Sequence, residues 1–135
     1  MIVDTSALIA IAWDEPERAR FEDAVEADPV RLVSAASVLE GAIVMMRRAG
    51  RAAAPEAVAR FHELLDQLGL EIEPVSASQI SLAETAYASF GKAMHPAGLN
   101  FGDRFAYALA KETGEPILFK GNDFTQTDLV AVLSP

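Results

Sequence analysis

Short apolar runs and longer helical segments alternate along the whole chain, and this alternation limits the fold more than any other feature. We expect strands over residues 1–4, 30–34, 70–75, 116–120 and 129–133, with helices between them that begin at 6–13 and end at 101–113. Alternating strands and helices are typical of a parallel sheet with helices on its faces. The predicted fold class is therefore α/β: a three-layer sandwich with a mostly parallel central sheet of about five strands covered by helices.

Length and composition narrow the class of protein. The chain has 135 residues and no cysteine, which fits one domain over residues 1–135 without disulfide bonds or thiolate metal ligands. No signal peptide precedes residue 4 and no apolar run is long enough to cross a bilayer, so we expect a cytoplasmic protein that does not contact a membrane. The net charge of −9 argues against a broad basic surface for nucleic acid. It still permits a nucleic-acid enzyme that contacts phosphate through metal ions and a few local cations.

Four acidic residues fall at comparable junctions between the expected elements. Asp4 ends the first strand, Glu40 lies early in the helix after the second strand, and Asp103 lies in the first turn of the helix that precedes the fourth. Asp123 follows the fourth strand. In a parallel α/β sheet the ligand crevice lies at the carboxyl ends of the strands. Carboxylates gathered there repel one another, and a hard divalent cation such as Mg²⁺ or Mn²⁺ relieves that repulsion.

Each acid taken alone also has an ordinary structural explanation. Asp4 fits a turn or a helix N-cap, and Asp123 fits a turn. Glu40 lies away from the apolar side of its helix, as an exposed glutamate does, and Asp103 is favoured by the helix dipole. The metal-site hypothesis therefore depends on the joint placement of the four acids.

Three motifs besides the first strand carry a resemblance to a known family. Met-Ile-Val-Asp-Thr-Ser-Ala-Leu opens the chain, and Ser-Val-Leu-Glu follows at residues 37–40. Leu-Asn-Phe-Gly-Asp-Arg-Phe-Ala-Tyr-Ala-Leu-Ala spans 99–110, and Leu-Phe-Lys-Gly-Asn-Asp-Phe-Thr-Gln-Thr-Asp-Leu spans 118–129. In this order they resemble the PIN-domain ribonucleases, and within them the VapC toxins of bacterial toxin–antitoxin pairs. The resemblance covers essentially the whole chain.

The resemblance implies an activity, a cofactor and a site. The expected protein is a Mg²⁺-dependent endoribonuclease, with Mn²⁺ as a possible substitute, that cleaves RNA with metal-activated water. Its catalytic and metal-binding residues would be Asp4, Glu40, Asp103 and Asp123. Thr5 or Ser6 would hydrogen-bond the site or a metal-bound water. The alternative is a catalytically weak PIN-like module that binds RNA or protein.

The same resemblance implies partners. The protein would act as the toxin of a type II toxin–antitoxin system, with a VapB-type antitoxin whose C-terminal segment covers the acidic pocket. A homodimer is expected by analogy, and the apolar residues 43–46 are the candidate surface.

Several other residues are weaker candidates for a role in the site. Arg104 departs from the small residue that often follows the third acid in relatives, and it is expected to face solvent, touch RNA phosphate or pair with an acid. Lys120 is placed to approach the phosphate backbone or simply to face solvent. His62 and His95 have no partner in the sequence that would orient a general base.

Overall fold

The central sheet is parallel and four-stranded. The computed structural model describes residues 1–133, and the strands lie in the order β3-β2-β1-β4. They are β1 (Ile2–Val3), β2 (Leu32–Ser34), β3 (Glu71–Glu73) and β4 (Ile117–Leu118). Six helices connect or follow them: α1 (Thr5–Ala12), α2 (Arg18–Ala27), α3 (Ala35–Ala49), α4 (Ala54–Gln67), α5 (Ala77–Phe90) and α6 (Asp103–Thr113). The α/β prediction is confirmed.

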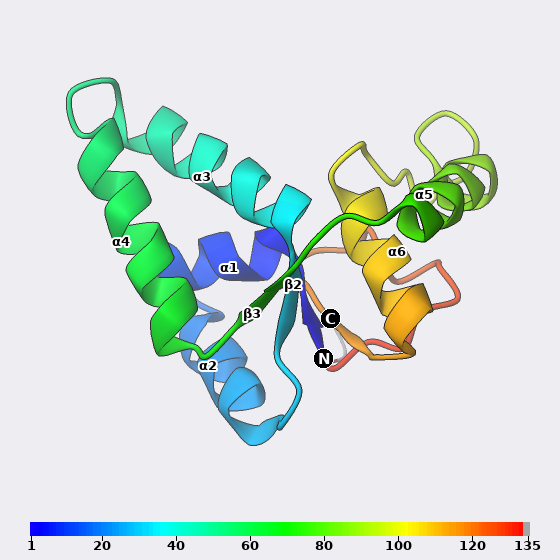
Figure 1. Ribbon diagram of the computed structural model, residues 1–135, viewed down its shortest axis with the longest axis horizontal. Helices are drawn as coiled ribbons and strands as arrows, with labels where there is room; N and C mark the ends of the chain where they lie inside the picture. Colours follow the sequence, from blue (N-terminus) through cyan, green and yellow to red (C-terminus); the bar gives the residue numbers. More distant parts are fainter. Residues whose placement is uncertain (134–135) are drawn as a thin grey trace.

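The two faces of the sheet belong to two separate hydrophobic cores, as the alternation of side chains along a strand requires. Val3 and its neighbour Leu118 lie in the core formed with α1 to α4. Ile2 and its neighbour Ile117 lie in the second core, which α6 and Ala86 of α5 complete. Figure 1 shows the resulting layers, with α1 to α4 on one side of the sheet and α5 and α6 on the other. The three-layer prediction is thus confirmed.

The strand predicted over residues 129–133 is wrong, and the sheet has four strands where about five were expected. This segment forms only an isolated parallel bridge between Ala131 and Ile117. Two hydrogen bonds make it: Ile117 N–H donates to the Val130 carbonyl, and Val132 N–H donates to the Ile117 carbonyl, both at 2.9 Å. Because β4 is two residues long, little backbone is left for a longer ladder.

Helix α3 buries a different side from the predicted one. The prediction placed an apolar stripe on Val38, Leu39, Ala42, Ile43 and Met46. The structure buries Val38, Ala42 and Met45, and leaves Leu39, Ile43 and Met46 at 62%, 43% and 37% exposure. The choice follows from packing, since α3 lies against α1 and α4. A Cβ on Gly41 would come within 2.4 Å of the Phe61 ring, so glycine permits the close contact of α3 with α4.

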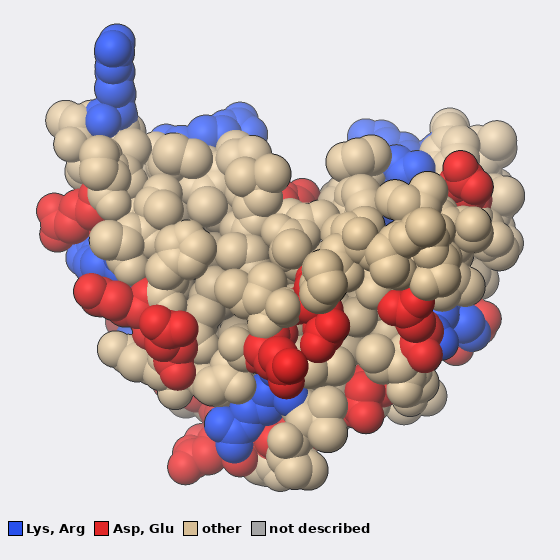
Figure 2. All heavy atoms as spheres, viewed as in Figure 1, with Lys and Arg blue, Asp and Glu red and all other residues tan. Residues whose placement is uncertain are grey.

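The carboxyl ends of the strands define one edge of the sheet, because the strands are parallel. Asp4 follows β1 there, and Ser34 ends β2 and caps α3 through its hydroxyl. Figure 2 shows the surface from the same side, hollowed between the α3–α4 half and the α5–α6 half. Among residues 1–133, no helix has the length and apolar character needed to cross a membrane.

Candidate active site

All four predicted acids line one hollow at the carboxyl edge of the sheet. Its remaining wall comes from β1–α1, α3 and the segments before α6 and after β4. The lining residues are Asp4, Thr5, Ser6, Ile9, Glu15, Glu40, Val44, Arg48, Asn100, Asp103, Lys120 and Asp123. Segments far apart in the sequence are therefore brought together here by the parallel sheet.

Asp4 lies at the bottom of this hollow and is 3% exposed. It is the N-cap of α1, and its Oδ2 accepts hydrogen bonds from the Ser6 backbone N–H at 2.9 Å and from Ser6 Oγ at 2.6 Å. The other oxygen, Oδ1, is buried and has no hydrogen-bond partner among residues 1–133. Burial raises the pKa of Asp4, and the Ser6 hydrogen bonds oppose that rise. Asp4 is thus both a helix cap and a buried acid with one free oxygen.

Glu40 is partly buried and is held from two directions. Thr5 Oγ1 donates a hydrogen bond to its Oε2 at 2.8 Å. On the other side its carboxylate lies against Gly102, where an added Cβ would come within 2.3 Å of both carboxylate oxygens. Glu40 therefore points into the hollow and is not the freely exposed helix glutamate of the alternative explanation.

Asp103, in the first turn of α6, is 7% exposed. Its Oδ2 accepts a hydrogen bond from the Asn100 backbone N–H at 2.6 Å. Burial raises the pKa of Asp103 to about 7, the Asn100 hydrogen bond opposes this, and repulsion from Asp4, Asp123 and Glu40 adds to it. The charges of the four acids are thus close enough to affect one another.

Asp123 is the exposed member of the set. It lies in the turn after β4, at the rim of the hollow. Its charge contributes to the raised pKa of Asp103. The turn position expected from Gly121-Asn122 and the place beside the other acids are therefore compatible.

Two residues that support the site were not singled out from the sequence. Asn100 Oδ1 accepts from the backbone N–H groups of Gly102 at 2.6 Å and Asp103 at 3.1 Å, which fixes the start of α6. Gly102 leaves room for the Glu40 carboxylate. An Asn three residues before a first-turn Asp is the available signal for the first. The role of Gly102 depends on a residue 62 positions earlier and has no local signal.

The chemistry of the donors fits a hard divalent cation. Every acidic donor is an oxygen, and the free Oδ1 of Asp4 is a buried acceptor without a partner in the described chain. Within residues 1–133, however, no three acidic or histidine side chains already stand as a set that could hold a metal ion. Ser6, Thr5 and Asn100 occupy oxygens of Asp4, Glu40 and Asp103 instead. Binding a metal would therefore require these side chains to adjust.

Arg104 takes none of its three expected positions. Its guanidinium lies 4.7 Å from the Tyr87 ring centroid and 5.4 Å from that of Phe101. Its Nε donates to the Asn100 carbonyl at 2.9 Å. Arg104 therefore braces the loop that holds Asp103, by stacking on aromatic rings and by one backbone hydrogen bond.

The two histidines lie outside this hollow. His62 is exposed on α4, and its ring contacts Phe61. His95 Nδ1 accepts from the Ala97 backbone N–H at 3.1 Å, and its ring packs on Phe90. Neither lines the hollow with the four acids.

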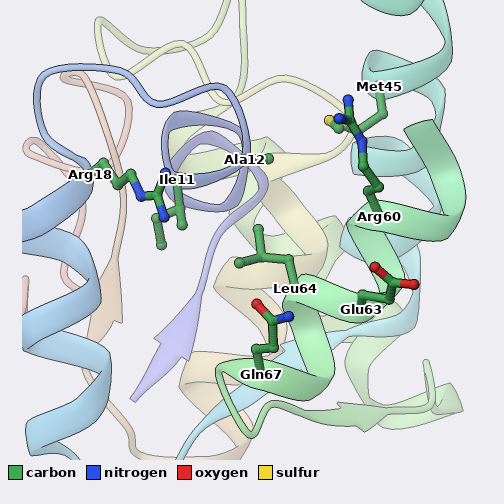
Figure 3. A pocket seen from close by; sticks show the side chains of 8 residues that line it. All are labelled: Ile11, Ala12, Arg18, Met45, Arg60, Glu63, Leu64 and Gln67. Carbon is green, nitrogen blue, oxygen red and sulfur yellow. The ribbon is translucent and has the colours of Figure 1, made fainter. Parts of the chain in front are cut away.

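A second hollow, enclosed by α1 to α4, contains none of the four acids. Figure 3 shows side chains from these helices around it, with Arg18, Arg60 and Glu63 among apolar neighbours. Its lining residues are Ile11, Ala12, Arg18, Met45, Arg60, Glu63, Leu64 and Gln67. It offers a single acid and no candidate for hydrolysis, so the candidate active site is the hollow at the carboxyl edge of the sheet.

A parallel sheet with acids at its carboxyl edge agrees with the comparison with known families. The PIN domain family matches residues 1–129. The chain is also similar over 99% of its length to the crystal structure of Mycobacterium tuberculosis VapC20, described as a sarcin-ricin loop cleaving toxin. The TM-score is 0.70, the identity is 23%, and 98% of that chain is covered. At this identity the structural match supports the fold alone.

Closer relatives define the group within the family. The chain is 47% identical over 135 residues to ribonuclease VapC30 of Mycobacterium tuberculosis, with 100% of both chains covered. It is 47% identical over 132 residues to a ribonuclease VapC of Mycolicibacterium smegmatis, covering 98% of this chain and 99% of that one. The chain belongs to the PIN-domain family, in its VapC ribonuclease group. The resemblance seen in the sequence motifs is therefore confirmed.

Proposed function

We propose that the protein is an endoribonuclease dependent on a divalent cation, Mg²⁺ with Mn²⁺ as a substitute, and the toxin of a type II toxin–antitoxin pair. The observation that carries this proposal is the convergence of Asp4, Glu40, Asp103 and Asp123 on one hollow in a chain of the VapC ribonuclease group. Relatives named ribonucleases, and a structural neighbour described as an RNA-cleaving toxin, support it.

Each residue of the hollow has a place in this proposal. Asp4 and Asp103 are the proposed metal ligands, joined by Glu40 and Asp123. A divalent cation supplies Lewis acidity that lowers the pKa of water and offsets negative charge on the scissile phosphate. Ser6 fixes the orientation of Asp4, and Thr5 fixes that of Glu40, through the hydrogen bonds described above. Asp103 must release its proton before it can bind a cation, which its raised pKa makes dependent on pH near neutrality.

The experiment that tests this function combines activity, metal dependence and target. Purified protein is incubated with total RNA in Mg²⁺, in Mn²⁺ or in chelator, and the 5′ ends of the fragments are mapped. We expect discrete cleavage with either cation, none with chelator, and fragments that carry 5′-phosphates. A protein that binds RNA and cation but leaves RNA intact would instead support the alternative, a PIN-like binding module without turnover.

The proposed partners follow from surface chemistry and family membership. The net charge of −9 suits a basic antitoxin segment placed over the acidic hollow. Helix α3 exposes Leu39, Ile43 and Met46, an apolar stripe with no cover among residues 1–133. This stripe includes two of the residues in the 43–46 segment, and we propose it as part of a homodimer interface. Sedimentation of a monomer at micromolar concentration would contradict the dimer. A cytoplasmic location stays a prediction.

A further inference from the structure

The hollow that contains the four acids also has a basic side. Among its lining residues, the cationic side chains are Lys120 and Arg48. Lys120 Nζ donates to Glu15 Oε2 at 2.8 Å and to Glu17 Oε2 at 2.7 Å, and Arg48 Nη1 donates to Glu15 Oε1 at 2.9 Å. We propose, on the basis of the RNA cleavage proposed above, that Lys120 and Arg48 bind the RNA phosphates flanking the cleavage site. Glu15 holds both cations in place until RNA replaces it.

The backbone of Lys120 has a fixed position relative to Asp4. Its N–H donates to Ser6 Oγ at 2.9 Å, and the same hydroxyl donates to Asp4 Oδ2 at 2.6 Å. The pairing of Val3 with Leu118 in the parallel sheet sets this arrangement. Two hydrogen bonds therefore connect the Lys120 backbone to a proposed metal ligand, and the side chain leaves from the rim of the hollow.

Arg48 lies farther from the acids on the same side. It is in the last turn of α3, eight residues after Glu40, which corresponds to about 12 Å along the helix axis. Its guanidinium lies 5.7 Å from the Trp13 ring centroid, so the ring and Glu15 both restrain it. At that distance Arg48 serves a phosphate other than the scissile one.

The charge of the site explains why these cations matter for RNA. Four carboxylates and an acidic protein repel a polyanion, so RNA needs local cations to approach. Hydrogen bonds from Lys120 and Arg48 lower the pKa of Glu15, which stays ionised and neutralises part of their charge. Carboxylate and phosphate are alternative partners for ammonium and guanidinium groups. Because Lys120 is 35% and Glu15 24% exposed, exchanging one for the other costs little.

A purely structural role makes a different prediction. In that case the ion pairs only fasten the segment after α1 to the segment after β4, and removing either partner has the same consequence. If the cations bind phosphate, loss of the cation and loss of the glutamate change the Michaelis constant in opposite directions. Lys120→Gln should weaken RNA binding, whereas Glu15→Gln should strengthen it by freeing the cations.

The test measures kcat and KM for wild type, Lys120→Gln, Arg48→Gln, Glu15→Gln and the Glu15→Gln/Lys120→Gln double variant on an RNA oligonucleotide carrying the mapped cleavage site. For each cation variant we expect KM to rise about tenfold with a much smaller change in kcat. The plot of log kcat/KM against log salt should lose about 0.7 of its slope per phosphate contact on single-stranded RNA. Glu15→Gln should lower KM, and the double variant should lose that gain.

Lys111→Gln is the matched control. Lys111 forms a surface ion pair with Asp128 at 2.9 Å at the far end of α6, outside the hollow. We expect its KM and salt slope to stay near those of wild type, and thermal unfolding verifies that all variants are folded. If Lys120→Gln and Glu15→Gln shift KM in the same direction, or neither shifts it, the phosphate site is overturned while RNA cleavage stands. Absence of cleavage by wild type overturns the proposed function and the phosphate site together.

Discussion

Thr5 Oγ1 donates a hydrogen bond to Glu40 Oε2 at 2.8 Å, which joins the first helix to the third across 35 positions of sequence. Thr5 is 7% exposed, so its hydroxyl lies in a site where water competes weakly for the carboxylate. The residue that follows Asp4 therefore sets the direction of a second acid of the quartet.

Removal of the Thr5 hydroxyl should lower catalysis without removing any acid. We expect Thr5→Val to reduce kcat by about 10- to 100-fold, the usual cost of losing a partner that orients a metal ligand. Thr5→Ser keeps the donor and should retain most of the activity. Steady-state RNA cleavage measures the effect, and a Thr5→Val variant as active as wild type would show that Glu40 needs no such support.

Asp4→Asn and Asp103→Asn should abolish metal-dependent RNA cleavage while leaving the protein folded. Each change keeps the shape of the side chain but removes the charge that a divalent cation requires. Cleavage of RNA and far-UV circular dichroism together measure the outcome. Asp66→Asn, an exposed acid on α4, is the matched control and should cleave RNA normally. Wild-type cleavage by a folded Asp4→Asn or Asp103→Asn variant would refute the assignment of these acids.

Gly102→Ala should disturb the site more than the fold. The added Cβ would come within 2.3 Å of both Glu40 carboxylate oxygens, so Glu40 must move or the loop before α6 must shift. We expect a loss of at least tenfold in kcat, with a cost in stability of about 1 to 3 kcal/mol. RNA cleavage and urea unfolding measure the two effects. Ala52→Ser, at an exposed position in the turn before α4, is the control and should match wild type in both measurements. Full activity of Gly102→Ala would show that the position of Glu40 does not depend on this close contact.

The stability of the protein without metal should depend on Asp103. Its pKa is about 7 when folded, against an ordinary value of 3.8, so the folded state penalises the charged carboxylate. The penalty is absent below pH about 4, grows as the pH rises to 7, and is complete above that. It amounts to at most about 4 kcal/mol, since one pKa unit corresponds to about 1.4 kcal/mol.

Asp103→Asn removes this penalty. In chelator at pH 8 we expect a higher free energy of unfolding for Asp103→Asn than for wild type, with the difference vanishing near pH 4. Added Mg²⁺ at pH 8 should stabilise wild type and have little effect on the variant. Urea unfolding at the two pH values measures both effects. A variant less stable than wild type at pH 8 in chelator would show that charged Asp103 does not destabilise the fold.

Local sequence patterns were sufficient to predict the α/β class and the positions of the four acids relative to strands and helices. Each acid lies next to an apolar run or a helical start that can be read within a few residues, and parallel strands necessarily bring their carboxyl ends to one edge. The placement of Asp4, Glu40, Asp103 and Asp123 around one hollow follows from those two facts.

The remaining features depend on which segments pack together, and no local pattern encodes that. Helix α3 has apolar residues nearly all round, so only its contact with α1 and α4 determined that Met45 is buried and Ile43 exposed. The final segment is apolar enough for a strand, but the short β4 leaves it a single bridge at Ala131. By itself the sequence determined the order of the elements and the chemistry at their ends. Only the tertiary structure decided that Thr5 and Gly102 hold Glu40, because burial and hydrogen bonding depend on neighbours distant in sequence.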